Sequence, residues 1–342
     1  MKSQIRIEEN YSLRNLNTFG LDVKAKYFVS VSNTSDLEDV LSSKVFAENK
    51  HFILGGGSNL LFTSDFDGII LLLNIQGIKV VEEDVSSVIV ECGAGEKWDD
   101  LVQFCVRNKF YGIENLAKIP GRAGAAPVQN IGAYGVEQKD CFQKLYGYNL
   151  ISFAYVEMSN QDCRFGYRDS VFKNELASRF IVTSIRYKLS KMKKLNISYK
   201  ELAKEIENTK IKDVDIQDIY DIISTIRKNK LPDPDEIGNT GSFFKNPVVS
   251  LTYYQNLKKN NPEIPGYILS ENEVKIPAGW LIEYCGWKGK SLGNAGVHKD
   301  HALVLVNNNN ASGEEILALA ESIEQSVCQK FGIALEKEVI VL

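Results

Sequence analysis

Short runs of alternating hydrophobic and polar positions dominate the first part of the chain, which is typical of β-strands. Residues 26–32 and 51–54 read as strands, and residues 35–46 between them have helical spacing that begins at a capping box of Ser35 and Glu38. This order predicts a small β-α-β unit. Apolar runs then follow one another as strands from residue 68 to residue 95.

Helical spacing becomes more frequent further along the chain. Residues 97–110 and 216–230 carry apolar side chains at helical intervals, and the segment LPDPDE that follows cannot continue the second helix. We expect a domain border there. Two more capping boxes, Ser198 with Glu201 and Ser312 with Glu315, predict helix starts, and Gly332 ends the last helix. Residues 181–190 and 336–342 read as strands.

Composition narrows the class of protein. The chain has 342 residues, is 44% hydrophobic and 25% charged, and carries a net charge of −4, which suits two or three globular domains. We expect a cytoplasmic protein, because no apolar leader or spanning segment is present, and we expect neither nucleic acid nor membrane as a partner. Six scattered cysteines indicate reduced thiols, and three histidines give no basis for a metal site.

Several nucleotide and catalytic motifs are absent. Tyr284 stands where a phosphate loop ending in GKS would need its first glycine, no GxGxxG occurs, and Ser242 lacks the flanking residues of a nucleophile elbow. Two loops rich in small residues remain, at 54–62 and 118–135. Because such loops let backbone N–H groups approach an anion closely, the pair predicts a cofactor cradle.

These loops occur in order with six other motifs: NTFG, FGYRDSVFK, KLPDP, GSFFKNP, KIPAGWLIE and LEKEV. Together they resemble the signatures of UDP-N-acetylenolpyruvoylglucosamine reductases, flavoenzymes of bacterial peptidoglycan precursor synthesis. The resemblance implies an α+β chain with an FAD-binding fold of the vanillyl-alcohol-oxidase type, made of two α+β subdomains, and a C-terminal α+β substrate-binding domain. We expect the subdomains at 1–74, joined by the strand at 333–342, and at 75–229, and the substrate-binding domain at 230–332.

The resemblance also implies the cofactors. We expect non-covalent FAD, and NADPH as the hydride donor at a site that it shares with the substrate, UDP-N-acetylglucosamine enolpyruvate. The product would be UDP-N-acetylmuramate. The residues expected to bind FAD are Gly55, Gly56, Gly57, Ser58, Asn59, Leu60, Pro120, Gly121, Gly124, Ala125, Gln129, Asn130, Gly132, Ala133 and Arg227.

By the same resemblance, Ser242 is the proton donor. A hydroxyl is a very weak acid, but it suffices when the base beside it is a carbanion, so no histidine partner is needed. Arg168 would contact the substrate carboxylate, and Glu338 would donate a hydrogen bond in its protonated form. Glu336 lies on the same strand face, and Glu338 is preferred for its place in the motif.

Tyr199, Lys230 and Asn246 are the residues expected to bind the substrate, with Tyr199 resembling the tyrosine of the longer subclass of the family. Lys230 could otherwise be a helix-end charge that complements the dipole. Two alternative functions remain open. One is an FAD-dependent alcohol oxidase of the same fold, and the other is a sensor of nucleotide sugars that has no catalytic activity.

Overall fold

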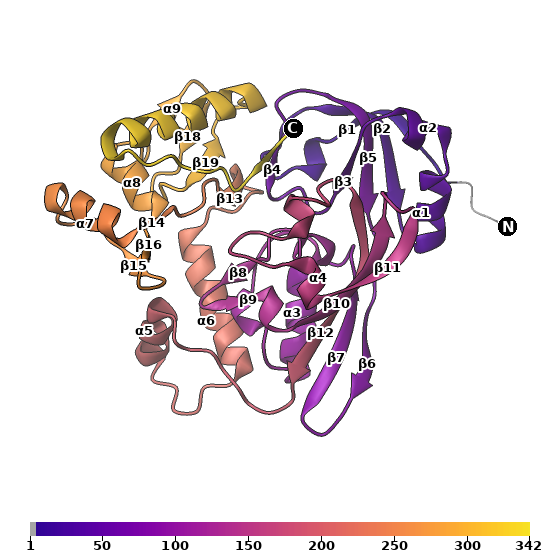
Figure 1. The fold of residues 1–342 in the computed structure, drawn as a ribbon, viewed down its shortest axis with the longest axis horizontal. Coiled ribbons are helices and arrows are strands. Elements are labelled where there is room, and N and C mark those ends of the chain that lie inside the picture. Colours follow the sequence, from indigo (N-terminus) through magenta and orange to yellow (C-terminus); the bar gives the residue numbers. More distant parts are fainter. Residues whose placement is uncertain (1–4) are drawn as a thin grey trace. The chain divides into compact units, whose positions relative to one another are not determined.

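The computed structural model describes residues 5–342 (Figure 1). Its contacts divide the chain into two compact units. The larger unit comprises the residues up to Tyr11, Ala25–Gly57 and Phe66–Arg227, and the smaller unit comprises Ser12–Lys24, Ser58–Asp65 and Lys228–Leu342. Within the described residues, no helix is long and apolar enough to cross a membrane. The three-part division expected from the sequence stays a prediction.

The first sheet of the larger unit contains the β-α-β unit that the sequence predicts. Its strand order is β1 (Glu8–Ser12), β2 (Lys24–Val31), β5 (Phe66–Leu73) and β3 (His51–Leu54). Both β2 and β3 run parallel to β5, which lies between them and is buried along nearly its whole length. A strand flanked by parallel neighbours is covered on both faces, which explains the continuous apolar run in β5.

Two helices, α1 (Thr34–Leu41) and α2 (Lys44–Glu48), connect β2 to β3. The predicted capping box at Ser35 is wrong: the N-cap is Asn33, whose side-chain oxygen accepts a hydrogen bond from the backbone N–H of Asp36 at 2.9 Å. Asparagine caps a helix as well as serine does, so the helix starts earlier than the box suggested.

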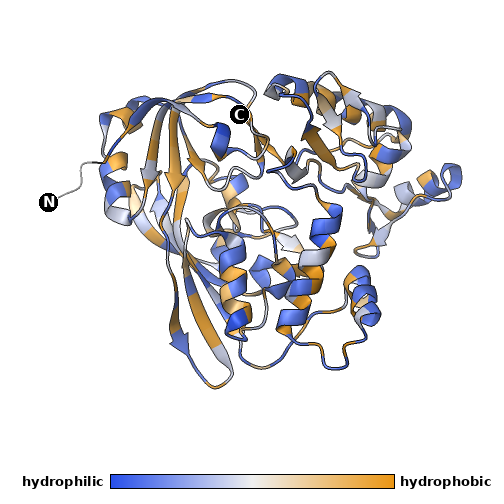
Figure 2. Cartoon of the chain, turned by 180° about the vertical axis from the view of Figure 1, so that it is seen from behind, coloured by the Kyte–Doolittle hydropathy of each residue, from blue (hydrophilic) through white to orange (hydrophobic). Residues whose placement is uncertain are grey.

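The second sheet of the larger unit is antiparallel throughout. Its order is β11 (Ala154–Ser159), β10 (Phe142–Asn149), β12 (Phe180–Ser190), β7 (Ser87–Gly93) and β6 (Ile78–Glu83). Figure 2 shows hydrophobic residues concentrated along the strands of this unit, whereas its helices carry both hydrophobic and hydrophilic residues. The helix α3 (Trp98–Arg107) follows β7 and lies within residues 97–110, where the sequence predicts helical spacing.

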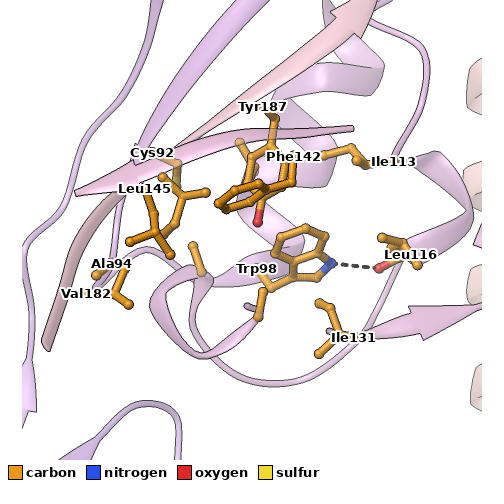
Figure 3. Packing of buried hydrophobic residues seen from close by; sticks show 14 of the residues in the cluster. Cys92, Ala94, Trp98, Ile113, Leu116, Ile131, Phe142, Leu145, Val182 and Tyr187 are labelled. Atoms are coloured by element: carbon orange, nitrogen blue, oxygen red, sulfur yellow. Dashed lines mark hydrogen bonds between the residues drawn. The ribbon is translucent and has the colours of Figure 1, made fainter. Parts of the chain in front are cut away.

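Aromatic side chains pack where α3 meets the second sheet (Figure 3). The indole of Trp98 is buried, lies edge-on to Tyr187 with 5.7 Å between ring centroids, and donates a hydrogen bond of 2.9 Å to the carbonyl oxygen of Leu116. Phe142 meets the same tyrosine ring edge-on at 6.2 Å. Such edge-to-face pairs add to the free energy gained from burial alone.

The remaining elements of the larger unit lie between the strands of the second sheet and after β12. They are η2 (Glu114–Leu116), η3 (Ala123–Ala125), β8 (Gly132–Ala133), β9 (Val136–Glu137), η4 (Gln138–Asp140), α4 (Asn160–Cys163), η5 (Val171–Lys173), α5 (Lys200–Thr209) and α6 (Ile216–Lys230). The predicted capping box at Ser198 is wrong, because α5 begins after Tyr199 with no side-chain cap. The prediction for α6 is confirmed, and LPDPDE follows it.

The smaller unit is also mixed. Its first sheet has the order β13 (Gly238–Ser242), β19 (Val304–Asn307), β18 (Ala295–Val297) and β17 (Ser291–Leu292). Its second sheet has the order β14 (Val248–Ser250), β16 (Glu273–Lys275) and β15 (Tyr267–Ile268). A third, two-stranded sheet pairs β4 (Leu60–Leu61) with β20 (Ile340–Val341). Its helices are η1 (Arg14–Leu16), α7 (Leu251–Asn260), α8 (Ala278–Tyr284) and α9 (Gly313–Phe331).

The predicted boundaries of the last helix are confirmed. Ser312 and Glu315 form a reciprocal capping box at the start of α9, and Gly332 ends it with a φ of 63°. The N-terminal motif NTFG supports the first sheet of this unit: Asn239 donates its backbone N–H to the carbonyl oxygen of Thr18 at 3.0 Å, and Asn307 donates to that of Phe19 at 2.9 Å.

Candidate active site

The two glycine loops contact one another within the larger unit. The first follows β3, and a Cβ added at Gly56 would lie only 2.7 Å from the Cα of Gly121 in the second loop. A Cβ at Gly55 would lie 3.3 Å from that of Ala125. Because backbone cannot yield as a flexible side chain does, only glycine fits at position 56. The close approach confirms that both loops belong to one structural feature.

The second loop is fixed against the end of β7. Gly121 has a φ of 111°, which side chains rarely adopt, and a Cβ at Gly124 would lie 2.6 Å from that of Ala94. The backbone N–H of Gly124 donates to the carbonyl oxygen of Ala94 at 2.9 Å, and the backbone N–H of Ala123 donates to the carbonyl oxygen of Glu96 at 2.8 Å. The small residues of this loop therefore serve close backbone packing.

Arg122 holds the second loop in place, and sequence reasoning missed it. Its Nη1 lies 2.9 Å from the carbonyl oxygen of Leu73, 2.9 Å from Oδ1 of Asn74 and 2.7 Å from the carbonyl oxygen of Gly95. These acceptors stand at the ends of β5 and β7. Burial lowers the pKa of the Arg122 guanidinium. Its signal in the sequence was plain, since it is the single charged residue between positions 119 and 135.

Asn130 is fully buried, and its side chain is engaged within the protein. Its Nδ2 donates to Oε2 of Glu137 at 3.0 Å and to the carbonyl oxygen of Gly166 at 2.9 Å. Its Oδ1 accepts from Nε2 of Gln138 at 3.3 Å and from the backbone N–H of Lys139 at 3.2 Å. A side chain with four such contacts orders its surroundings, and direct binding of a cofactor would have to replace one of them.

Arg227 reaches the second loop from α6. Its Nε donates to the carbonyl oxygen of Lys118 at 3.1 Å, and burial lowers its pKa. Lys118 forms an ion pair of 2.8 Å with Asp99, which raises the pKa of the lysine. Burial opposes ionisation of Asp99, but hydrogen bonds from Lys118, Gln103 and Tyr220 outweigh it and hold the carboxyl pKa below its usual value. The start of the loop is thus tied to α3 and α6.

Arg168 lies in a tight turn of the larger unit with a φ of 53°. Its Nη2 donates to the carbonyl oxygen of Gly132 at 2.5 Å, and its guanidinium lies 5.4 Å from the ring centroid of Tyr167. The next residue, Asp169, accepts a hydrogen bond from Nδ2 of Asn174 at 2.9 Å. The structure therefore brings Arg168 to the second glycine loop.

Tyr199 lies beside the same loop, while Lys230 is the last residue of α6. The Tyr199 ring meets the Tyr134 ring edge-on at 5.4 Å between centroids, and the residue is 45% exposed. Burial raises the pKa of Tyr134 to about 12. Asn196 anchors the segment before Tyr199 by donating to the carbonyl oxygen of Gly135 at 3.0 Å.

Ser242 and Glu338 are brought together in the smaller unit. Ser242 ends β13 opposite Val304, after a bulge in which Gly241 has a φ of 70°. The backbone N–H of Glu338 donates to the carbonyl oxygen of Phe243, the residue after Ser242, at 2.9 Å. Asn59 of the first loop donates to the carbonyl oxygen of Glu338 at 3.2 Å. Backbone pairing therefore fixes the positions of both predicted catalytic residues of this unit.

The neighbouring carboxylate, Glu336, pairs with Lys245 and is 70% exposed. Asn246 uses its Oδ1 to accept a hydrogen bond from the backbone N–H of Ala278 at 2.9 Å, at the start of α8. Across residues 5–342, no group of three or more histidine, cysteine, aspartate or glutamate side chains could hold a metal ion.

Comparison with known proteins defines the class first. A family model described as an FAD binding domain matches residues 25–151. The crystal structure of UDP-N-acetylenolpyruvylglucosamine reductase from Thermus caldophilus superposes with a TM-score of 0.68 at 23% identity, and the match covers 99% of both chains. The crystal structure of p-cresol methylhydroxylase superposes with a TM-score of 0.52 at 9% identity, and the match covers 96% of this chain and 84% of the hydroxylase chain. The chain is an α+β flavoprotein of the vanillyl-alcohol-oxidase-type fold, as the sequence predicted.

The family follows from closer relatives. A model described as UDP-N-acetylenolpyruvoylglucosamine reductase, C-terminal domain, matches residues 233–342. The reductase of Flavobacterium johnsoniae is 45% identical over 339 residues, which cover 99% of this chain and 100% of the relative, and that of Paraburkholderia phymatum is 44% identical over 97% of each. The chain belongs to the UDP-N-acetylenolpyruvoylglucosamine reductase family.

Proposed function

We propose that the protein reduces UDP-N-acetylglucosamine enolpyruvate to UDP-N-acetylmuramate with FAD as its resident cofactor and NADPH as the reductant. Family membership over nearly the full chain is the observation that carries this proposal. Bound FAD supplies a carrier that takes hydride from NADPH and gives it to the methylene carbon of the enolpyruvyl group. The protein itself must bind the substrate, stabilise charge and deliver a proton.

The glycine loops fit a flavin dinucleotide. Gly56 and Gly121 approach so closely that no side chain fits at position 56, and loops of such small residues let a diphosphate come close to the backbone. We assign FAD binding to these loops and to Arg227. The binding is non-covalent, so acid precipitation should leave the flavin in the supernatant. Flavin that pellets with the protein would contradict this.

Ser242 is the proposed proton donor. Hydride addition at the methylene carbon leaves negative charge on the neighbouring carbon, and that carbon is basic enough to take the hydroxyl proton of serine. The bulge at Gly241 and the pairing with β19 hold this residue at the end of a strand, and no histidine is required.

Arg168 and Glu338 are the proposed partners of the developing charge. The arginine would bind the substrate carboxylate, and the glutamic acid would donate a hydrogen bond to it. Glu338 is favoured over Glu336 because the latter is paired with Lys245 and largely exposed. The backbone bond from Glu338 to Phe243 also keeps it next to Ser242 in the smaller unit.

Lys230, Tyr199 and Asn246 are the proposed contacts of the sugar nucleotide. Asn246 would act through its Nδ2, because its Oδ1 already accepts a hydrogen bond from Ala278. NADPH would use the same site in turn, which predicts ping-pong kinetics. Intersecting lines in steady-state plots would contradict the shared site. We also propose a cytoplasmic location, where both substrates would be found.

A coupled assay separates this function from its alternatives. NADPH consumption should depend on the enolpyruvyl sugar nucleotide and should yield one reduced product per NADPH without hydrogen peroxide. Peroxide formed in proportion to an alcohol substrate would favour an oxidase. Tight binding of the sugar nucleotide with no NADPH consumption would favour a sensor without catalytic activity.

A further inference from the structure

Three hydrogen bonds join the turn that carries Arg168 to the second glycine loop. Alternate residues of the loop take part: the carbonyl oxygen of Val128 accepts from Oγ of Ser170 at 2.5 Å, and that of Gly132 accepts from Nη2 of Arg168 at 2.5 Å. Between them, Nδ2 of Asn130 donates to the carbonyl oxygen of Gly166 at 2.9 Å. The turn is thus held at both ends and at its tip by one segment of the loop.

The middle contact is the most strongly fixed of the three. Asn130 is fully buried, and its Oδ1 accepts from Gln138 and from the backbone N–H of Lys139, so its amide cannot rotate without losing several bonds. A buried amide whose donors and acceptor are all hydrogen-bonded orders its neighbours. Removing one partner leaves a buried polar group unpaired, which costs more free energy than the hydrogen bond itself contributed.

The backbone of the turn needs such support. Gly166 and Asp169 close it with mutual backbone hydrogen bonds of 3.0 and 3.4 Å, and Arg168 between them has a left-handed φ of 53°. An arginine adopts this conformation only at a cost, and it persists where surrounding contacts hold it. Release of Gly166 would let the turn relax and would move the guanidinium.

We propose that Asn130 is a positioning residue for Arg168, and that its buried amide fixes the guanidinium against the second glycine loop. The inference rests on the proposed contact between Arg168 and the substrate carboxylate. It also changes the role expected for Asn130: the side chain aligns the substrate arginine and does not bind FAD directly. The turn and the loop belong to the same compact unit, so the argument needs no other part of the molecule.

The test compares the two half-reactions in Asn130→Asp, which keeps the acceptor and loses the donor. Aspartate also tolerates the left-handed φ of 44° at this position. Flavin reduction by NADPH should stay near the parental rate, whereas reoxidation by the enolpyruvyl substrate should fall by about 10²-fold, as expected for a misplaced substrate contact. A defect that was merely structural would slow both half-reactions equally and would overturn the inference.

Arg168→Lys and the double variant complete the experiment. If Asn130 acts through Arg168, the double variant should reoxidise no more slowly than the slower single variant. Additive losses would contradict this. Parental reoxidation in Arg168→Lys would remove the proposed role of Arg168 and this inference with it, while a slow Arg168→Lys beside a parental Asn130→Asp would overturn the inference alone.

Two further variants serve as controls. Asn174→Ala removes amide bonds to Asp169 and Ser170 from the same turn without touching the glycine loop, so its reoxidation rate should change much less. Asn130→Gly removes the amide, permits the same backbone conformation and adds no charge, and it replaces the aspartate if that variant loses FAD. Loss of FAD from both variants would overturn the inference, because Asn130 would then build the cradle itself.

Discussion

The glycine loops of the larger unit and the strand end at Ser242 in the smaller unit are built in opposite ways. The loops approach one another closely because side chains are missing: a methyl group at Gly56 would overlap the backbone of Gly121. At the strand end, backbone pairing places two side chains, Ser242 and Glu338. The comparison indicates that substitutions in the first region should damage cofactor binding, and substitutions in the second should damage proton delivery.

The largest expected effect tests the second region. Ser242→Ala should leave flavin reduction by NADPH near normal and should slow reoxidation by the enolpyruvyl substrate by roughly 10²–10⁴-fold, the loss typical of a positioned acid. Ser242→Cys should retain more activity because it keeps a donor. Stopped-flow absorbance of the flavin measures both steps. Parental reoxidation in the alanine variant would leave Ser242 as an ordinary turn residue.

A graded pair of substitutions tests the first region. Gly56→Ala forces overpacking against backbone, which costs ~1–3 kcal/mol. If this whole cost is expressed in cofactor binding, the affinity for FAD should fall by roughly ten- to a hundredfold. Gly55→Ala should weaken FAD less, because its Cβ would lie 3.3 Å from a side-chain methyl group. Fluorescence titration of the apoprotein gives both dissociation constants. The reverse order would show that the contact between the loops does not shape the cradle.

The substrate contacts should give smaller effects. Tyr199→Phe should weaken the sugar nucleotide by about 1.5 kcal/mol, or about tenfold, as for a hydrogen bond to a charged group. Lys230→Ala should cost at least as much and should make binding less sensitive to salt. Tyr155→Phe is the control, since that tyrosine is similarly exposed and bonds Thr183. Equal dissociation constants for Tyr199→Phe and the control would remove Tyr199 from the site.

The smallest expected effect is on stability and concerns the N-terminal caps of two helices, one in each unit. Ser312→Ala removes a confirmed capping box and should lower the free energy of unfolding by about 1 kcal/mol. Ser35→Ala should change it by less than about 0.5 kcal/mol, because Asn33 caps that helix. Chemical denaturation followed by circular dichroism compares them. Equal losses of unfolding free energy in the two variants would show that Ser35 caps its helix, as the sequence suggested.

Much of the fold was predictable because periodic patterns decide it. The parallel unit around β5, the helix α6 and the boundaries of α9 follow from apolar spacing, caps and glycine. The capping boxes at Ser35 and Ser198 failed for a local reason. A serine followed three residues later by a glutamate occurs by chance, and either a better cap stood nearby or the helix began without one.

The site was predictable where it depends on motifs and unpredictable where it depends on contacts. Glycine spacing predicted both loops, but their mutual contact comes from the tertiary structure. Arg122 was missed because its three acceptors lie at positions 73, 74 and 95. The four contacts of the Asn130 side chain were equally invisible, since one of them comes from Gly166.

Anaerobic mixing in two steps tests the central claim most directly. Purified protein mixed with NADPH should lose its oxidised-flavin absorbance, and addition of UDP-N-acetylglucosamine enolpyruvate should restore it with one equivalent of UDP-N-acetylmuramate formed per flavin. This result would establish that one flavin carries the hydride between two ligands that bind in turn. Flavin that stays reduced after the sugar nucleotide is added, or a protein that binds no flavin even after reconstitution, would contradict the account.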